Sequence, residues 1–237
     1  MVRIAVCRVK GPRVVEWGGE MAIRMSETSK LGTLSWSLEA FETCPGARDL
    51  TSGDIAAACQ GCYARGGNYR FANVKAPRAE NKEDWKRGEW VAEMVVLLEG
   101  ERHFRWFDSG DMYALGLAEK IFEVMEQTPE TKHWLPTRMG KFAKFAEVIG
   151  RMRALPNVMV RFSSDSVTGE YDQRHGSVIV ADAKSVPAGV KLCRAYERGG
   201  KCGGCRACYD KRIAVIGYPG HGRAMAKVLE RAGAVAV

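Results

Sequence analysis

Seven of the eight cysteines fall into two groups whose spacing is typical of metal sites. The first group ends in the run Cys-Gln-Gly-Cys-Tyr-Ala, and the second contains Cys-Gly-Gly-Cys-Arg-Ala-Cys. Their members are Cys44, Cys59 and Cys62 in the first group and Cys193, Cys202, Cys205 and Cys208 in the second. Four thiolates complete the coordination of a tetrahedral zinc ion or a 4Fe–4S cluster, whereas three leave one metal position open. The counts therefore predict one closed site and one open site.

The second group favours iron over zinc. Three of its members follow a Cys-x2-Cys-x2-Cys spacing, which resembles half of a bacterial ferredoxin motif. Zinc sites usually pair two Cys-x2-Cys units across a longer loop, so zinc stays an alternative at either group. Gly203 and Gly204 allow the sharp turn that wraps such a loop around a metal. Whether this metal only stabilises the fold of the loop or also takes part in a reaction stays open.

The first group lies after the first strand of the predicted sheet, at an edge where α/β active sites gather. Its open position predicts a small-molecule ligand bound directly to the metal. A structural zinc ion completed by a histidine is the alternative. His221, in the run Gly-Tyr-Pro-Gly-His-Gly, could complete such a site or contact a ligand.

Polar residues follow further strands. The run from Asp108 through Ser109 and Gly110 to Asp111 comes directly after a strand at 103–107 and could hold a ribose, an amino group or a cation. Asp111 could equally cap the following helix.

Two more strand ends repeat this pattern. Arg138 follows the third strand, and Arg161 and Ser163 belong to the end of the fourth. Because such ends converge in a parallel sheet, a shared pocket is predicted. Either arginine could bind a carboxylate or a phosphate there.

The 237 residues, 46% of them hydrophobic, are enough for one good core. No run of eighteen apolar residues and no signal peptide is present, so a cytoplasmic protein without membrane contact is expected. Thiols stay reduced in that compartment, which favours metal ligation over disulfides. Cys7 stands alone in an apolar run and is expected to be a core thiol.

The formal net charge of +8 suggests an anionic partner. The basic residues are dispersed, however, and acidic residues interleave them between Lys82 and Arg87. That pattern is more typical of a solvated helix face than of a nucleic-acid surface, although nucleic acid stays open as a partner.

Strands and helices are predicted to alternate, which is typical of parallel βαβ units. Strands are expected at 33–41, 103–107, 133–135, 158–162, 177–181 and 213–216, and helices at 81–98, 114–126, 141–155 and 223–232. Trp85, Trp90, Met94 and Leu97 are the expected buried face of the first helix. About six strands are too few for a closed eight-stranded barrel, so an open partial barrel or a doubly wound sheet is predicted.

Three parts of the chain are expected. Residues 1–30 form a strand and turn extension, and residues 31–237 form a partial α/β barrel. Residues 183–212 form a cysteine-rich, cluster-binding insertion within that barrel.

The Cys-x-x-Cys-Tyr-Ala loop, the Asp-Ser-Gly-Asp strand end and the final cysteine group followed by Pro-Gly-His resemble a phage protein family known as gene product 88. The resemblance runs from about Lys30 to His221. That family is similar in pattern to radical-SAM enzymes, which use a partial (β/α)6 barrel. The resemblance implies a phage-encoded protein in the cytoplasm of the host cell.

It also implies roles for particular residues. In radical-SAM enzymes three cysteines hold a 4Fe–4S cluster whose fourth iron binds S-adenosylmethionine, and Cys44, Cys59 and Cys62 match them in position. Tyr63 would lie beside that cluster, and Asp108 to Asp111 would hold the amino group of the cofactor. The second group would carry an auxiliary cluster, and an electron donor would be a partner. Fourteen residues separate Cys44 from Cys59, in place of the usual Cys-x3-Cys-x2-Cys spacing.

The sequence thus predicts a radical-SAM-like iron–sulfur protein with two 4Fe–4S clusters. Two alternatives stay open. One is a non-catalytic binding protein that is stabilised by metal and has nucleic acid as a candidate partner. The other is a redox or structural cluster protein without S-adenosylmethionine chemistry.

Overall fold

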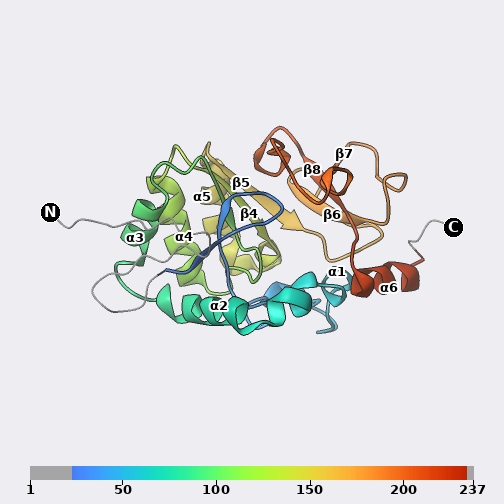
Figure 1. Ribbon diagram of the computed structural model, residues 1–237, viewed down its shortest axis with the longest axis horizontal. Helices are drawn as coiled ribbons and strands as arrows, with labels where there is room; N and C mark the ends of the chain where they lie inside the picture. The colour runs from blue at the N-terminus through green and yellow to red at the C-terminus, as the bar shows by residue number, and fades with distance from the viewer. Residues whose placement is uncertain (1–22, 234–237) are drawn as a thin grey trace.

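The computed structural model describes residues 23–233 and shows a mixed α/β protein built on one eight-stranded, mostly parallel sheet (Figure 1). The strands are β1 (Met25–Glu27), β2 (Leu34–Trp36), β3 (His103–Trp106), β4 (Lys132–Thr137), β5 (Val158–Ser163), β6 (Gly176–Val180), β7 (Val190–Leu192) and β8 (Val215–Pro219). Their order across the sheet is β1-β2-β3-β4-β5-β6-β8-β7. Among the strands of residues 23–233, β1 and β2 pair antiparallel and every other pair is parallel.

This strand order tests one of the two predicted topologies, the doubly wound sheet. From β2 to β6 each strand lies beside its predecessor in the chain, and β8 follows next to β6. A doubly wound sheet would instead reverse its order at a switch point. The sheet is therefore singly wound, and the prediction of a doubly wound alternative was wrong.

Helices follow β2, β3, β4 and β8, whereas no α-helix lies between β5 and β8. The helices are α1 (Ala57–Gln60), α2 (Ala72–Asp84), α3 (Trp90–Leu97), α4 (Leu115–Gln127), α5 (Ala146–Ala154) and α6 (Arg223–Arg231). Helix α4 packs between α3 and α5, and α1 packs against α6 (Figure 1). No helix among residues 23–233 has both the length and the apolar character that a membrane crossing needs.

The two faces of the sheet differ because side chains alternate along a strand. On β3, Phe104 and Trp106 point into the main core, where Trp106 lies 6.3 Å from Trp36 between ring centroids. His103 and Arg105 point to the opposite, more polar face. Large aromatic side chains contribute most of the stabilisation on the first face, at about 2–3 kcal/mol for each fully buried ring.

The cysteine-rich segment between β6 and β8 packs on the polar face. The Tyr209 ring contacts the rings of His103 and Trp134, with centroids 5.0 and 6.0 Å apart. Its hydroxyl lies 3.3 Å from Oγ1 of Thr33, the residue before β2. This segment therefore closes one end of the polar face and leaves the other end, at the carboxyl ends of the strands, open.

Several predicted elements differ in detail. The predicted helix at 81–98 is two helices, α2 and α3, because the chain turns between residues 85 and 89. Trp90, Met94 and Leu97 are buried as predicted, and Trp85 is partly buried against the same core. The predicted strand at 33–41 ends at Trp36.

Two predicted segments take part in the sheet. Residues 1–22, including Cys7, lie outside the described residues, but residues 25–27 of the predicted N-terminal extension form edge strand β1. Residues 183–212 do lie between two strands, yet they contain β7, which pairs with β8 at the other edge. Part of the predicted insertion thus belongs to the sheet itself.

Candidate functional site

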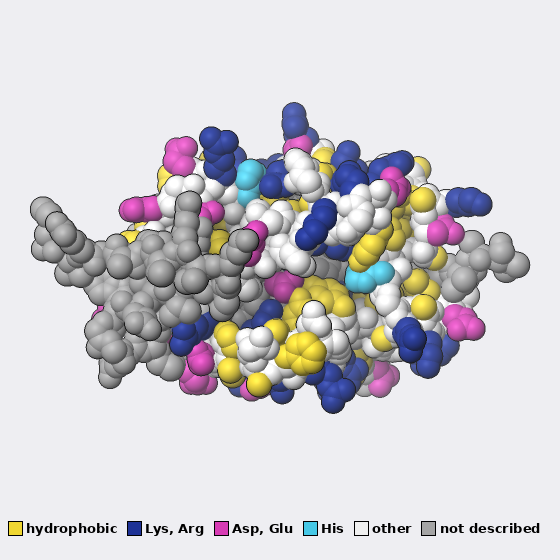
Figure 2. All heavy atoms as spheres, in the orientation of Figure 1, with side chains coloured by type: hydrophobic (Ala, Val, Ile, Leu, Met, Phe, Trp, Pro, Cys, Tyr) yellow, Lys and Arg dark blue, Asp and Glu magenta, His cyan; other side chains and the backbone are white. Residues whose placement is uncertain are grey.

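A cavity of about 790 Å³ lies at the carboxyl ends of the parallel strands. Figure 2 shows a hollow near the centre of one face, beside a patch of hydrophobic side chains. Most of the predicted site residues line the cavity, drawn from six separate stretches of chain. These residues are Cys44, Cys59, Cys62, Tyr63, Asp108, Ser109, Gly110, Asp111, Arg138, Ser163, Cys193, Cys202, Cys208 and His221. Arg161 and Cys205 do not line it.

The first cysteine group lies in the loop after β2 and around the short helix α1. Cys44 ends a turn that begins at Phe41, and Cys59 is buried within α1. The Cys62 N–H donates to the Cys59 carbonyl over 3.2 Å, which closes a tight turn between these two cysteines. Gly61 lies between them, and a Cβ there would come within 2.7 Å of Met225 on α6. Close packing of α1 on α6 therefore fixes this pair.

These thiols are free and electrostatically coupled. Burial, with a further contribution from the Asp111 carboxylate, raises the pKa of Cys44 to about 12, and negative charge on Cys62 or Cys59 raises it too. Burial also raises the pKa of Cys59 and of Cys62, while the Arg138 guanidinium partly opposes this rise. Without a metal the thiols stay protonated at neutral pH, so a metal must displace their protons.

The second cysteine group is attached at three points. The Cys193 N–H, just after β7, donates to the Gly217 carbonyl over 2.8 Å. The Cys202 N–H donates to the Lys30 carbonyl over 2.7 Å, which ties the loop to the β1–β2 turn. Cys208 Sγ lies 3.1 Å from the Tyr218 hydroxyl on β8. Cys205 is exposed.

Burial also shapes the chemistry of this group. It raises the pKa of Cys208 to about 11, although the hydrogen bond from Tyr218 opposes the rise. Burial raises the pKa of Cys202, and nearby Cys193 and Cys205 add to it. The four thiols are thus close enough to influence one another.

Arg161 holds the second cysteine loop in place. Its side chain is fully buried and donates Nε to the Cys208 carbonyl over 3.0 Å. Nη2 donates to the carbonyls of Ala207 and Asp210 over 3.2 and 3.1 Å, and Nη1 to that of Ala214 over 3.2 Å. The sequence suggested an anion-binding residue, whereas the guanidinium here binds main-chain oxygens away from the cavity.

Among residues 23–233, no group of three or more His, Cys, Asp or Glu side chains has the compact arrangement that holds a single metal ion. A tetrahedral zinc ion needs sulfur atoms about 2.3 Å from one centre. A 4Fe–4S cluster binds each thiolate to a different iron atom and needs wider spacing. The donor chemistry of both groups suits soft metals such as iron or zinc.

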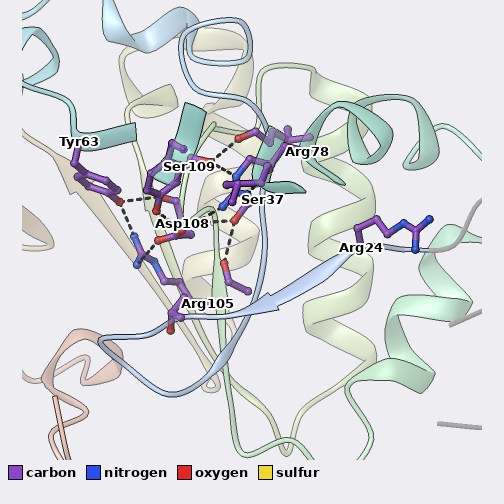
Figure 3. A network of polar contacts seen from close by, with 12 residues as sticks. Arg24, Ser37, Tyr63, Arg78, Arg105, Asp108 and Ser109 are labelled. Carbon is purple, nitrogen blue, oxygen red and sulfur yellow. Dashed lines mark hydrogen bonds and ion pairs between the residues drawn. The ribbon is translucent and has the colours of Figure 1, made fainter. Parts of the chain in front are cut away.

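Asp108 is the centre of a polar network at the end of β3 (Figure 3). Its carboxylate accepts hydrogen bonds from Tyr69 and forms ion pairs with Arg78 and Arg105, at 3.4 and 3.2 Å. The Tyr63 hydroxyl donates to its carbonyl oxygen over 2.7 Å. This network anchors Tyr63, the residue next to Cys62.

Ser109 and Asp111 are bound within the protein. The Ser109 hydroxyl accepts from Arg78 over 2.8 Å and donates to the Leu38 carbonyl over 2.7 Å. The Asp111 carboxylate accepts from Thr137 Oγ1 and from the Met112 and Arg138 N–H groups, at 2.7 to 2.9 Å. Asp111 therefore links the ends of β3 and β4 and does not cap α4, whose N-cap residue is Ala114.

Gly110 and Arg138 connect this network to the cysteine loop. Gly110 has φ +81°, and a Cβ there would lie 2.6 Å from Leu38 and 2.7 Å from Thr43, beside Cys44. The Arg138 guanidinium donates to Asp165 Oδ1 over 3.1 Å.

His221 lies between the two cysteine loops. Its ring is stacked 6.3 Å from that of Tyr63, which follows Cys62, and lies 4.9 Å from that of Tyr196, near Cys193. Burial lowers its pKa, so the ring is neutral at pH 7.

Sequence reasoning missed many cavity residues, among them Arg78, Arg105, Tyr69, Trp134 and Tyr218. A signal existed for Arg105, because the alternation along β3 places it opposite the two aromatic residues of the core. No comparable signal existed for Arg78 and Tyr69, which reach the cavity from α2 and from the turn before it.

The model of the gene product 88 family matches residues 19–211 of the chain. The chain belongs to this family. The match includes all seven cysteines of the two groups and ends before His221. Neither the curated proteins nor the solved structures contain a match to the chain.

Proposed function

We propose that this protein is a radical-SAM-like iron–sulfur protein with an open 4Fe–4S cluster on Cys44, Cys59 and Cys62. A second, closed cluster would be held by Cys193, Cys202, Cys205 and Cys208. The observation that carries the proposal is the convergence of three free thiols and the polar strand ends on one cavity.

The sheet supports this assignment. Six parallel strands, β2 to β6 and β8, lie in sequential order, which is the order expected of a partial (β/α)6 barrel. The three thiols follow the first of these strands. A cavity of about 790 Å³ falls within the range of small-molecule sites, roughly 300–1,000 Å³.

The sequence spacing of the second group supports iron–sulfur clusters over zinc. Its Cys-x2-Cys-x2-Cys run resembles half of a bacterial ferredoxin motif, whereas zinc sites usually pair two Cys-x2-Cys units across a longer loop. When bound and reduced, an open cluster of this kind would supply the electron that cleaves a carbon–sulfur bond of S-adenosylmethionine.

The chain's own residues would bind and orient that ligand. Ser163 lines the cavity beside the first cysteine group and offers a hydroxyl donor, while the Arg138 guanidinium, bound to Asp165 and to the Ser164 carbonyl, forms part of the wall. Tyr63, held by Asp108, would fix one wall next to Cys62. The surrounding apolar lining would exclude water from a reactive intermediate.

The decisive experiment is anaerobic purification followed by measurement of iron, acid-labile sulfide and zinc per chain. About eight irons are expected for two clusters. An electron paramagnetic resonance spectrum that changes on addition of S-adenosylmethionine, and release of 5′-deoxyadenosine after reduction with dithionite, would support the proposal. Cys59→Ser should abolish the release, and Cys7→Ser, outside both groups, should leave it unchanged.

Other results would replace the proposal. Eight irons without 5′-deoxyadenosine would leave a cluster protein of another kind. Two zinc ions without sulfide would favour the binding protein stabilised by metal, for which a salt-dependent shift of DNA or RNA mobility would be the next test.

A second candidate is a redox or structural cluster protein without S-adenosylmethionine chemistry. The position of His221 favours it, since the ring stacks on Tyr63 and so lies close to Cys62. His221 would then be the fourth ligand of the first cluster. In that case His221→Ala should destroy the first cluster, whereas an unchanged spectrum would exclude this ligand.

A further inference from the structure

We propose that Arg105 and Trp134 form a binding site for the anionic group, a carboxylate or a phosphate, of a small ligand seated between the two cysteine groups. The site is separate from the thiols and stands whichever metal they hold. Only its use as an anchor beside an open cluster rests on the proposed function.

Two buried donors in this cavity have no acceptor. Among the described residues, five buried side-chain polar atoms lack a hydrogen-bond partner, and Arg105 Nε and Trp134 Nε1 are two of them. Both side chains line the cavity, and the Arg105 guanidinium lies 4.8 Å above the Trp134 ring. Buried N–H groups without an acceptor are rare, and a bound ion or a functional role is a recognised explanation.

The geometry of the guanidinium suits an anion with two oxygens. Nη1 binds Asp108 Oδ1 over 3.2 Å, whereas Nη2 makes only a 3.5 Å contact with the Tyr63 hydroxyl (Figure 3). Nε and Nη2 share one edge of the group, and such an edge matches a carboxylate or a phosphate in a bidentate pair. The long 3.5 Å contact leaves Nη2 weakly bound, and the Tyr63 hydroxyl keeps an acceptor of its own, the Asp108 carbonyl.

The charges around this edge also favour an anion. Arg78 and Arg105 share the single carboxylate of Asp108, which leaves one positive charge without a counter-charge. Lys30, at the mouth of the cavity, binds the Tyr196 hydroxyl over 2.9 Å and makes no ion pair with a carboxylate of the described residues. Buried charges are costly unless they are paired.

The remaining acidic side chains of the lining do not supply that counter-charge. Glu27 is exposed at the edge strand, and the Asp111 carboxylate is already bound by three donors near β4. An anionic ligand would therefore complete both the charge balance and the hydrogen bonding of the cavity.

The position of the site defines what it anchors. Trp134 belongs to the same packed cluster as Cys202 and Cys208, while Tyr63 adjoins Cys62. A ligand held at Arg105 therefore lies between the two cysteine groups. Its anion could be the carboxylate of S-adenosylmethionine or a group on a separate substrate.

Isothermal titration calorimetry of the full chain, purified without oxygen, tests the site with pyrophosphate and succinate as probes. We expect saturable binding of one probe molecule per chain. Arg105→Gln should weaken it about tenfold or more, because a charged bidentate contact is lost. The matched control is Arg102→Gln, which removes an exposed arginine from the residue before β3 and should leave the affinity unchanged.

Trp134→Phe provides a second variant that keeps an aromatic ring under the guanidinium and removes Nε1–H together with the five-membered ring of the indole, with an expected loss of about threefold to tenfold. If a thermal melt shows that Arg105→Gln is unfolded, the affinity of Trp134→Phe for the probe tests the proposal instead. Absence of saturable binding to the wild-type chain, or equal affinities in the Arg105, Trp134 and Arg102 variants, would overturn the proposal.

Titration with S-adenosylmethionine identifies the source of the anion. If Arg105→Gln weakens its binding and pyrophosphate competes with it, the anion is the carboxylate of that cofactor. If its binding is retained, the anion belongs to a separate ligand. Iron content and 5′-deoxyadenosine release, measured on the same preparation, report separately on the proposed function.

Discussion

The two cysteine groups use the same type of side chain but are supported in different ways. The first lies at the carboxyl ends of the strands, where burial and the contact between α1 and α6 hold Cys59 and Cys62. The second lies on a surface loop with Cys205 exposed, and one buried guanidinium, that of Arg161, binds the loop from within. Because different contacts hold the two groups, a substitution should be able to destroy the metal site of one group and leave that of the other intact.

The largest expected difference is between Cys59→Ser and Cys205→Ser. Each variant should lose about four of about eight irons, because each removes one ligand of one cluster. Only Cys59→Ser should reduce 5′-deoxyadenosine release, by more than the 10–100-fold that is typical of changes around a metal ligand. Iron analysis and product release check this. Equal loss of release in both variants would show that the two groups act as one unit.

The next largest expected difference is in the rates at which cysteines of the two groups are alkylated in the metal-free chain. With a pKa of about 12, Cys44 has a thiolate fraction of about 10⁻⁴ at pH 8, so iodoacetamide should modify it far more slowly than exposed Cys205. The Cys44 rate should rise about tenfold per pH unit up to that pKa, because the thiolate is the nucleophile. Mass spectrometry of timed samples measures both sites. A Cys44 rate that matched Cys205 at pH 8 would contradict the burial argument.

Arg161→Gln should destabilise the second group selectively. The change leaves several main-chain carbonyl oxygens without their charged donor, and a loss of about 3 kcal/mol in the free energy of unfolding is expected. Iron held by the second group should fall while the first group stays loaded. Urea denaturation and iron analysis measure these effects. Arg212→Gln, an exposed arginine near the same loop, is the control and should cost less than about 0.5 kcal/mol.

The smallest expected difference is between two glycine substitutions. Gly110→Ala should cost about 2 kcal/mol, because its positive φ is unfavourable for alanine and the added Cβ collides with Leu38 and Thr43. Gly199→Ala, near the second group, has a positive φ but open space around it and should cost about 1 kcal/mol. Thermal melts compare them. A cost for Gly199 as large as that for Gly110 would mean that strain, and not the contact with the Cys44 loop, dominates.

Sequence patterns predicted much of the sheet but not all of its boundaries. Helices α4 and α6 and strands β3 to β6 lie within about two residues of the predicted ranges, because each has a strong local periodicity. The short strands β1 and β7 were not predicted as such, since three residues give too little pattern. The predicted helix at 81–98 is interrupted between Asp84 and Trp90, and Trp85 and Trp90 both pack on the main core.

Arg105 and Arg161 show where sequence reasoning about the site stopped. Both lie on parallel strands and face the polar side of the sheet, and nothing in their neighbours distinguishes them. Only the path of the cysteine segment, about fifty residues further along the chain, surrounds Arg161 with carbonyl oxygens and leaves Arg105 at the cavity with a free N–H.

The sequence by itself determined the two cysteine groups, the alternation of strands and helices, and the polar residues at strand ends, because each of these depends on short-range spacing. Tertiary structure alone decided that Cys44 lies against Asp111 and that His221 lies between Tyr63 and Tyr196. Contacts between residues so far apart along the chain depend on how every element packs, and no local pattern records that outcome.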